Sequence, residues 1–237
     1  MNTEVLASKL VDWLKEKVYS AGATGAVFGM SGGIDSAVVA VLCKKAFGQN
    51  ILGLFLPCYS SKKDEEDAIR VAQKFQIPFK KISLDPVYDT FMTILDPTEN
   101  KTAKANIKPR LRMITLYYYA ASKNYLVVGT GNKSELTVGY FTKYGDGGVD
   151  LLPLGNLVKS QVRDLARFFE IPEDIIEKPP TAGLWEGQTD EGEMGISYKE
   201  LDTYILTGEA LPHIKEKIEN MNKKSEHKRS LPLIPPF

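Results

Sequence analysis

Cysteine, histidine, net charge and long apolar runs are all scarce in this sequence. Its 237 residues contain two cysteines, Cys43 and Cys58, and two histidines, and the cysteines do not form a CxxC pair. This usage excludes a disulfide framework and a cysteine-rich zinc site, and it favours a reducing compartment, the cytoplasm. Lysine plus arginine and aspartate plus glutamate each total 30, so no basic field points to nucleic acid as a partner. No segment approaches the ~20 apolar residues of a membrane span, so we expect no membrane association.

What is present is the composition of a globular protein. Hydrophobic residues make up 43% of the chain and charged residues 25%, a balance typical of a domain that buries its own core. A chain of this length fits one large α/β domain, and no linker or repeat divides it. We therefore expect a single domain over residues 1–237.

Short apolar segments alternate with segments of helical periodicity along the chain. Strands are predicted over 25–30, 51–57, 78–84 and 125–129. Helices are predicted over 6–18, 34–47, 65–75, 87–95, 105–123, 159–169, 198–206 and 213–222. This alternation predicts an α/β fold, with a doubly wound, mostly parallel sheet and helices on both faces. The segment 182–195, rich in glycine and acidic residues, has no periodicity and is expected to be a loop.

A phosphate-binding loop is predicted between the first strand and its helix. The segment reads GMSGGIDS and consists of Gly29, Met30, Ser31, Gly32, Gly33, Ile34, Asp35 and Ser36. Its glycines permit close backbone approach, and free N–H groups at a helix N-terminus attract anions such as pyrophosphate. The loop lacks the lysine of GxxxxGK[ST] and the glycine spacing of GxGxxG. Walker-type kinases and simple dehydrogenases are therefore disfavoured.

The string SGGxDS resembles the loop of the ATP pyrophosphatase family, which cleaves ATP to AMP and pyrophosphate while adenylating a substrate. The resemblance implies a Rossmann-like, adenine nucleotide alpha hydrolase-like fold. A carboxylate beside a phosphate site requires a cation between them, so we interpret Asp35 as a Mg²⁺ ligand. The alternative is that Asp35 only caps the helix, as aspartate often does near an N-terminus.

Motifs in the rest of the chain indicate which group of enzymes with this loop the sequence resembles. The segments GTGNKSE (129–135), GYFTKYGDGGVD (139–150), NIKPR (106–110), KPPTA (178–182) and EHKR (226–229) are similar to segments of NAD synthetases and occur in that family's order. The resemblance covers about residues 25–230. It implies an enzyme that amidates deamido-NAD to NAD with ammonia and ATP.

The resemblance also implies a set of site residues. ATP is expected to meet residues 29–36 together with Thr130, Lys159 and Thr181. Mg²⁺ is expected at Asp35 and Glu135, and catalysis is assigned to Asp35 and Lys159. Deamido-NAD is expected to meet Arg110, Lys143, Asp150, His227 and Lys228.

Each assignment has a simpler alternative. The alternative for Glu135 is a solvated helix acid, and for Lys159 a surface lysine. Lys159 opens a helix whose positive end attracts phosphate, which favours phosphate binding. Arg112 is an alternative to Arg110 as the arginine that binds the dinucleotide. His227 is also explained by a solvated tail. Asp35, Glu135 and Lys159 together favour catalysis over a nucleotide sensor. Another ATP pyrophosphatase with the same loop, amidating or thiolating, is the other alternative, and the absence of reactive cysteine pairs disfavours a thiolating one.

Further expectations follow from the resemblance. The motifs occupy nearly the whole chain, so no glutaminase domain is expected and the nitrogen donor is free ammonia or ammonia from another protein. A homodimer is expected, with a dinucleotide site that draws on both subunits. We interpret 182–195 as a lid that protects an acyl-adenylate from water, with Trp185 and Met194 contacting the ligand; an ordinary surface loop is the alternative.

Overall fold

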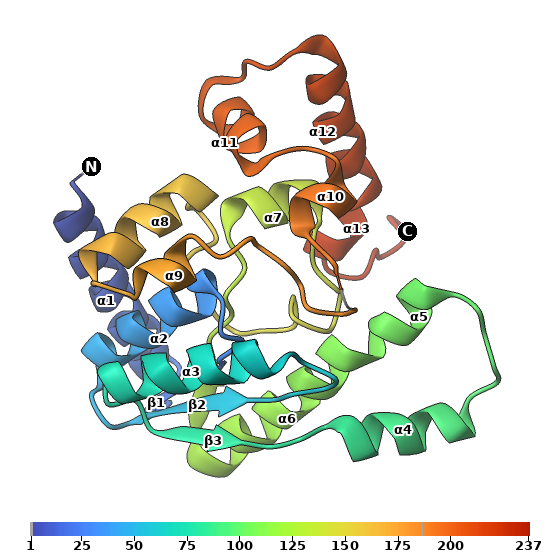
Figure 1. Cartoon of the computed structure of the whole chain (residues 1–237). Helices are drawn as coiled ribbons and strands as arrows, with labels where there is room; N and C mark the ends of the chain where they lie inside the picture. Colours follow the sequence, from blue (N-terminus) through green and yellow to red (C-terminus); the bar gives the residue numbers. More distant parts are fainter. Residues whose placement is uncertain (1, 186) are drawn as a thin grey trace.

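The computed structural model describes residues 2–185 and 187–237 and has a parallel sheet at its centre (Figure 1). The sheet has four strands in the order β3-β2-β1-β4. They are β1 (Gly25–Gly29), β2 (Ile51–Phe55), β3 (Phe79–Lys81) and β4 (Tyr125–Val127). All neighbouring pairs are parallel. The predicted strands are confirmed, although each ends earlier than expected.

Helices connect the strands and form the C-terminal part of the chain. They are α1 (Thr3–Ser20), α2 (Ile34–Phe47), α3 (Lys62–Lys74), α4 (Asp85–Ile94), α5 (Lys101–Ala105), α6 (Ile107–Lys123), α7 (Lys133–Val138), α8 (Lys159–Phe168), α9 (Glu173–Ile176), α10 (Asp190–Met194), α11 (Tyr198–Thr207), α12 (Pro212–Lys224) and α13 (Glu226–Arg229). None of the helices in the described residues is both long and apolar enough to cross a membrane.

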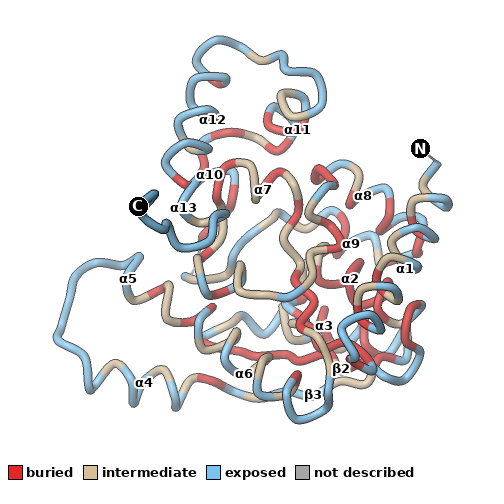
Figure 2. The backbone as a smooth tube through the Cα atoms, turned by 180° about the vertical axis from the view of Figure 1, so that it is seen from behind, coloured by how far each residue is buried: buried red, intermediate tan, exposed pale blue. Residues whose placement is uncertain are grey.

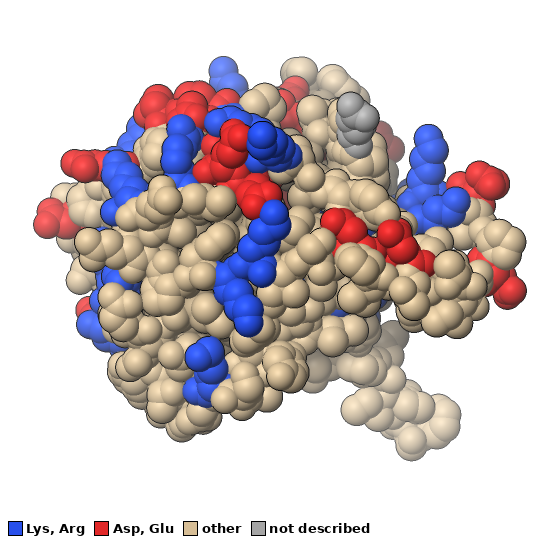
Figure 3. All heavy atoms as spheres, turned by 60° about the horizontal axis from the view of Figure 1, so that its bottom comes forward, with Lys and Arg blue, Asp and Glu red and all other residues tan. Residues whose placement is uncertain are grey.

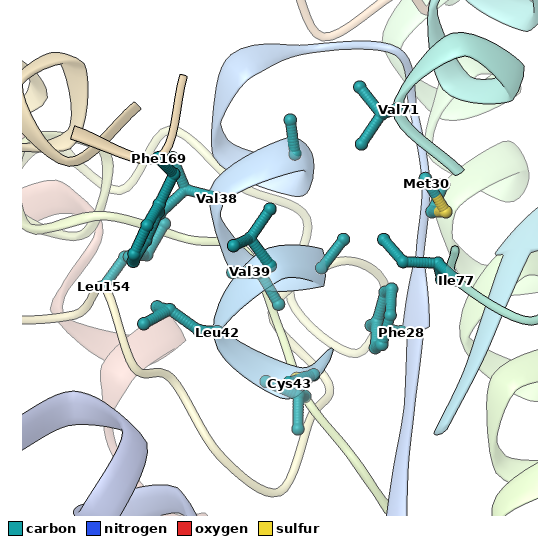
Figure 4. Packing of buried hydrophobic residues seen from close by; sticks show 14 of the residues in the cluster. Phe28, Met30, Val38, Val39, Leu42, Cys43, Val71, Ile77, Leu154 and Phe169 are labelled. Atoms are coloured by element: carbon teal, nitrogen blue, oxygen red, sulfur yellow. The ribbon is translucent and has the colours of Figure 1, made fainter. Parts of the chain in front are cut away.

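The sheet is covered on both faces because side chains alternate along its strands. In β1, Ala26 and Phe28 join a core with α1, α2, α3 and α8, whereas Val27 joins a second core with α4 and α6. Helix α2 lies within the first core and is buried along most of its length, as Figure 4 shows around Val38, Val39 and Leu42. The chain moves outward from β1 to β3 and then returns to β4 through α6 on the other face. This reversal confirms the doubly wound α/β prediction.

A third apolar cluster lies among the C-terminal helices. It joins Val138 of α7 with residues of α10, α11 and α12, including Met194 and Leu201. In Figure 2 its buried segments stand apart from those around the sheet, while the α4–α5 connection is exposed along its length.

The prediction that 182–195 is a loop throughout is wrong in its second half. Thr189 caps α10 by accepting a hydrogen bond from the Gly192 N–H, and Met194 is 2% exposed in the third cluster. Met194 therefore does not contact a ligand as expected, whereas Trp185 is exposed. Helices α5, α7, α9, α10 and α13 have no counterpart in the sequence prediction because each is too short to show helical periodicity. Glu186, within the proposed lid, lies outside the described residues.

Candidate functional site

The phosphate loop joins the carboxyl end of β1 to the first turn of α2, as predicted. Gly32 has a φ of +79°, and a side chain there would overlap the backbone of Asp64 at the start of α3. The Gly33 N–H donates to Ser31 Oγ at 3.3 Å, and the Ser36 hydroxyl donates to the Gly33 carbonyl at 2.9 Å. The loop is thus held in a defined shape by its own hydroxyl groups.

Some loop residues can reach a ligand only through the backbone. The side chains of Met30 and Ile34 belong to the core. Gly33 is the N-cap of α2 and has no side chain that could cap the helix, so the N–H groups of the first turn of α2 are available to an anion. The Asp35 carboxylate accepts hydrogen bonds from the side chains of Asn132 and Lys159. The alternative that Asp35 only caps this helix is therefore wrong.

Asp35, Glu135 and Lys159 are brought together at the carboxyl edge of the sheet. The Lys159 ammonium donates to Asp35 Oδ2 at 2.5 Å and lies 3.8 Å from Glu135 Oε1. The Asn132 side-chain amide donates to Asp35 Oδ1 at 2.9 Å. These residues start α2, α7 and α8, so three helix N-termini meet at one place. Open α/β sheets bind ligands at this edge, where the direction of the connections reverses.

The GTGNKSE motif positions Glu135 through a capping box. Asn132 Oδ1 accepts from the Glu135 N–H at 3.0 Å, and Glu135 Oε2 accepts from the Asn132 N–H at 3.1 Å. This reciprocal pair fixes one carboxylate oxygen and leaves Oε1 directed toward Lys159. Glu135 is therefore a partly buried site residue rather than a solvated helix acid.

The cluster carries more negative than positive groups. Lys159 is 2% exposed, and although burial disfavours its charged form, Asp35 and Glu135 raise its pKa. Burial and the neighbouring Asp35 raise the pKa of Glu135. Burial also raises the pKa of Asp190, which accepts from the Tyr198 hydroxyl through Oδ2 at 2.9 Å. Asp190 Oδ1 is buried with no hydrogen-bond partner among the described residues.

This donor set fits a hard divalent cation. The acidic excess and the oxygen ligands suit Mg²⁺, which Asp35 and Glu135 would hold. Among residues 2–185 and 187–237, no three histidine, cysteine, aspartate or glutamate side chains form a complete metal site. The remaining ligands would then be phosphate oxygens and water, as is usual for Mg²⁺.

The two threonines assigned to ATP have different surroundings. Thr130 follows β4 and is half-buried. Thr181 is exposed, and its Oγ1 accepts from the Gly183 N–H at 3.1 Å. The segment that carries Thr181 reaches the phosphate loop through Lys178, whose ammonium lies 3.5 Å from the Gly32 carbonyl oxygen.

Most residues assigned to deamido-NAD form a second group. Arg110 donates to the Lys143 carbonyl at 3.4 Å, and the Lys143 ammonium donates to the His227 carbonyl. Lys228 donates to the Gly139 and Phe141 carbonyls at 2.8 Å each. The start of α6, the loop after α7 and helix α13 therefore meet here, and the Arg110 and His227 side chains are exposed.

Asp150 and Arg112 are engaged in other contacts. Asp150 accepts from the Tyr117 hydroxyl at 2.9 Å and from the Val127 N–H at 2.8 Å, which ties β4 to α6. Arg112 donates to the Leu56 carbonyl at 3.0 Å. Arg112 thus supports the end of β2, and Arg110 is the freer of the two arginines.

Sequence reasoning did not select several residues of this site. Asn132 could have been found from the N-x-x-E spacing of a capping box. Asp190 and Tyr198 have no such signal, because each reaches the site from a distant part of the chain. Lys178 begins the family segment KPPTA, but the sequence did not indicate that it contacts the phosphate loop.

The fold and the site together define a nucleotide-binding α/β protein of the adenine nucleotide alpha hydrolase-like class. A protein-family model described as NAD synthase matches residues 6–232, and the chain belongs to this family. The family predicted from the motifs is confirmed.

Named relatives agree with this assignment. The chain is 53% identical over 239 residues to the NH3-dependent NAD+ synthetase of Carboxydothermus hydrogenoformans, covering 99% of this chain and 98% of the relative. It is similar to a structure described as NMN synthetase from Francisella tularensis, with a TM-score of 0.96, 41% identity and all of both chains covered. It is also similar to the NH3-dependent NAD synthetase from Campylobacter jejuni, with a TM-score of 0.83, 34% identity and 99% of both chains covered.

Proposed function

We propose that this chain amidates deamido-NAD to NAD, using ammonia and ATP and releasing AMP and pyrophosphate. The observation that carries the proposal is the Asp35–Lys159–Glu135 cluster beside the phosphate loop. A carboxylate oxygen is a poor leaving group, so amide formation requires prior activation. The nicotinate carboxylate attacks the α-phosphorus of ATP and pyrophosphate leaves; ammonia then attacks the acyl carbon of the adenylate, and AMP leaves.

The residues of this chain have separable tasks in this reaction. The backbone N–H groups of the phosphate loop and of the first turn of α2 bind the pyrophosphate. Lys159 places a fixed positive charge where negative charge develops as pyrophosphate departs. Mg²⁺, held by Asp35 and Glu135, would neutralise phosphate charge when bound. Arg110, Lys143, Asp150, His227 and Lys228 are proposed to bind deamido-NAD.

The test is to mix the protein with ATP, Mg²⁺, deamido-NAD and ammonium, and to measure NAD, AMP and pyrophosphate. All three products should form in equal amounts. ATP binding without AMP release would instead identify a nucleotide sensor. AMP release that depends on a different carboxylate or thiol acceptor would identify another ATP pyrophosphatase with the same loop.

A second candidate function comes from the similarity to the protein described as NMN synthetase. That enzyme's name indicates a product with one nucleotide rather than two, and its chain superimposes with a TM-score of 0.96. The chemistry at the carboxylate is the same, so only the dinucleotide contacts would differ. Comparing kcat/KM for nicotinate mononucleotide and deamido-NAD decides between the two substrates.

We propose that residues 1–237 act as one domain located in the cytoplasm. Lys159 beside the sheet and Tyr198 of the C-terminal helices share one buried cluster, with the Lys159 ammonium 5.0 Å from the Tyr198 ring. Cys43 and Cys58 are buried free thiols, which suits a reducing compartment. The balanced charge does not favour a nucleic-acid or membrane partner.

We also propose a homodimer, for which the exposed face of α4 and α6 offers a surface. Large apolar side chains are exposed there, among them Ile94, Ile114 and Tyr118. In Figure 3, which brings the lower side of Figure 1 forward, uncharged atoms cover most of the visible face. An exposed apolar surface of this kind is typical of a protein–protein contact.

An Ile114→Asp change should prevent dimer formation, because it places a charge in the proposed interface. The expected molar mass at micromolar concentration is that of a dimer for the wild type and a monomer for the variant. Ile114 is 60% exposed, and Leu206 of α11 is 58% exposed, so Leu206→Asp is a matched control that should remain dimeric. A fully active monomeric wild type would refute the proposal.

The lid proposal now applies to residues 182–189, since α10 is already folded. Lys108 donates to the Leu184 carbonyl and the Leu184 N–H donates to Gln188, both at 2.8 Å, and the buried Gln188 amide donates to Glu193 at 2.7 Å. We expect ATP plus deamido-NAD to slow hydrogen exchange in 182–189, because closure protects the acyl-adenylate from water. Residues 190–194 provide an internal comparison with little change. Equal exchange of 182–189 with and without ligands would mean that the segment is not a lid.

A further inference from the structure

Lys178 connects three segments at the edge of the phosphate loop. It lies between α9 and α10, shortly before Thr181. Its ammonium donates to Asp64 Oδ1 at 2.7 Å, to Asp67 Oδ2 at 2.9 Å and to the Gly32 carbonyl at 3.5 Å. The side chain is only 20% exposed. Burial disfavours the ammonium, but the hydrogen bonds with Asp64 and Asp67 raise the pKa of Lys178, so it remains charged.

Helix α3 lies directly against the same part of the loop. The backbone of Asp64 occupies the space that a side chain at Gly32 would need. Ser61 fixes this end of α3 by accepting from the Asp64 N–H at 3.1 Å. The loop and the start of α3 therefore fit together closely, and Lys178 bonds to both.

The two aspartates differ in how much they depend on Lys178. Asp67 is 1% exposed and also pairs with Lys63 at 2.8 Å and Arg70 at 3.1 Å. For Asp64, Lys178 is the cation within salt-bridge distance in the described part of the chain. Loss of Lys178 would thus leave Asp67 paired while it releases Asp64 and the Gly32 carbonyl.

We propose that Lys178 is a positioning residue that holds Gly32 against α3, so that the loop N–H groups stay directed at the pyrophosphate of ATP. The inference rests on the proposed function, which places ATP phosphates at this loop. Gly32 has a positive φ and the conformational freedom of glycine, and the hydroxyl groups of Ser31 and Ser36 bond to Gly33 but not to Gly32, so the bond from Lys178 adds a restraint at Gly32 itself. The Lys178 ammonium already donates hydrogen bonds to Asp64 and Asp67. Lys178 therefore has a structural role and is not a free phosphate ligand.

The experiment measures Mg²⁺-pyrophosphate binding by calorimetry and ATP kinetics in Lys178→Ala. We expect pyrophosphate affinity to fall and KM for ATP to rise by about tenfold, the loss of one charge-assisted restraint, while kcat changes by less than about threefold. Lys178→Arg should restore most of the affinity. Arg70→Ala is the control, because Arg70 pairs with Asp67 and with Asp174 and forms no salt bridge with a residue of the phosphate loop, and this variant should bind pyrophosphate like the wild type.

Asp64→Asn separates positioning from direct phosphate binding. If Lys178 acts through the loop, Asp64→Asn weakens pyrophosphate binding too, and the double variant is no worse than the single ones. If Lys178 binds phosphate itself, freeing it from Asp64 strengthens binding, which would overturn the inference. Thermal unfolding midpoints check that each variant is folded, and if Lys178→Ala does not fold, Lys178→Arg and Asp64→Asn still decide.

The outcomes also separate this inference from the proposed function. If the wild type does not bind Mg²⁺-pyrophosphate, the assignment of the loop to ATP fails. If the wild type binds it and Lys178→Ala binds it equally well, only the role of Lys178 is refuted.

Discussion

Replacing Asp35 with asparagine is expected to lower pyrophosphate release by at least about 1,000-fold while the chain remains folded. Asparagine keeps the size of the side chain and can still accept hydrogen bonds from Asn132 and Lys159. It removes the negative charge with which Asp35 would hold Mg²⁺, so the departing pyrophosphate loses its counter-charge. Alanine is a less informative change, because it would also remove the hydrogen-bond acceptor of the buried Lys159 and so add a loss of stability to the loss of charge.

The measurement is pyrophosphate release in the presence of deamido-NAD and Mg²⁺, together with urea unfolding. Asp164→Asn makes the same charge change on the exposed surface of α8 and should retain the wild-type rate. Wild-type turnover in Asp35→Asn would remove the metal assignment. Unfolding of this variant without ligands would instead show that Asp35 is needed mainly to neutralise Lys159.

Substituting alanine for Gly32 is expected to abolish detectable ATP binding and to destabilise the chain by more than about 2 kcal/mol. Two causes add at this position. The residue has a φ of +79°, which L-residues rarely adopt, and the added Cβ would overlap the carbonyl group of Asp64. Because backbone atoms cannot move aside easily, either α3 or the phosphate loop must shift.

Gly22→Ala provides the matched control for this prediction. Gly22 has a φ of +73°, and an added Cβ there meets nothing within 4 Å. This variant should show only the conformational cost, about 1–2 kcal/mol, and bind ATP normally. Calorimetric ATP titration and urea unfolding of both variants are the measurements. Equal stability losses for the two would show that contact with α3 does not fix the loop.

The local parts of the site were predictable because sequence neighbours form them. The loop from Gly29 to Ser36 lies between a buried apolar strand and a periodic helix, and each of these patterns is visible within a few residues. The capping-box spacing of Asn132 and Glu135 is local in the same sense. The resemblance to the family added Lys159 and Thr181, which spacing alone would not have selected. The short helix α10 was missed because its five residues are too few to show a period.

The sequence by itself determined the parallel α/β sheet, the phosphate loop and the acidic residues placed beside it, because alternation, periodicity and helix starts are encoded over short stretches. Only the tertiary structure decided which distant groups meet there. Lys159 pairs with a carboxylate 124 positions away, and Lys178 bonds to the loop across 146 positions. It also decided that Asp150 ties β4 to α6 and that Met194 is in a core. Such contacts depend on how the helices pack over the sheet, and the spacing of residues along the chain does not predict that packing.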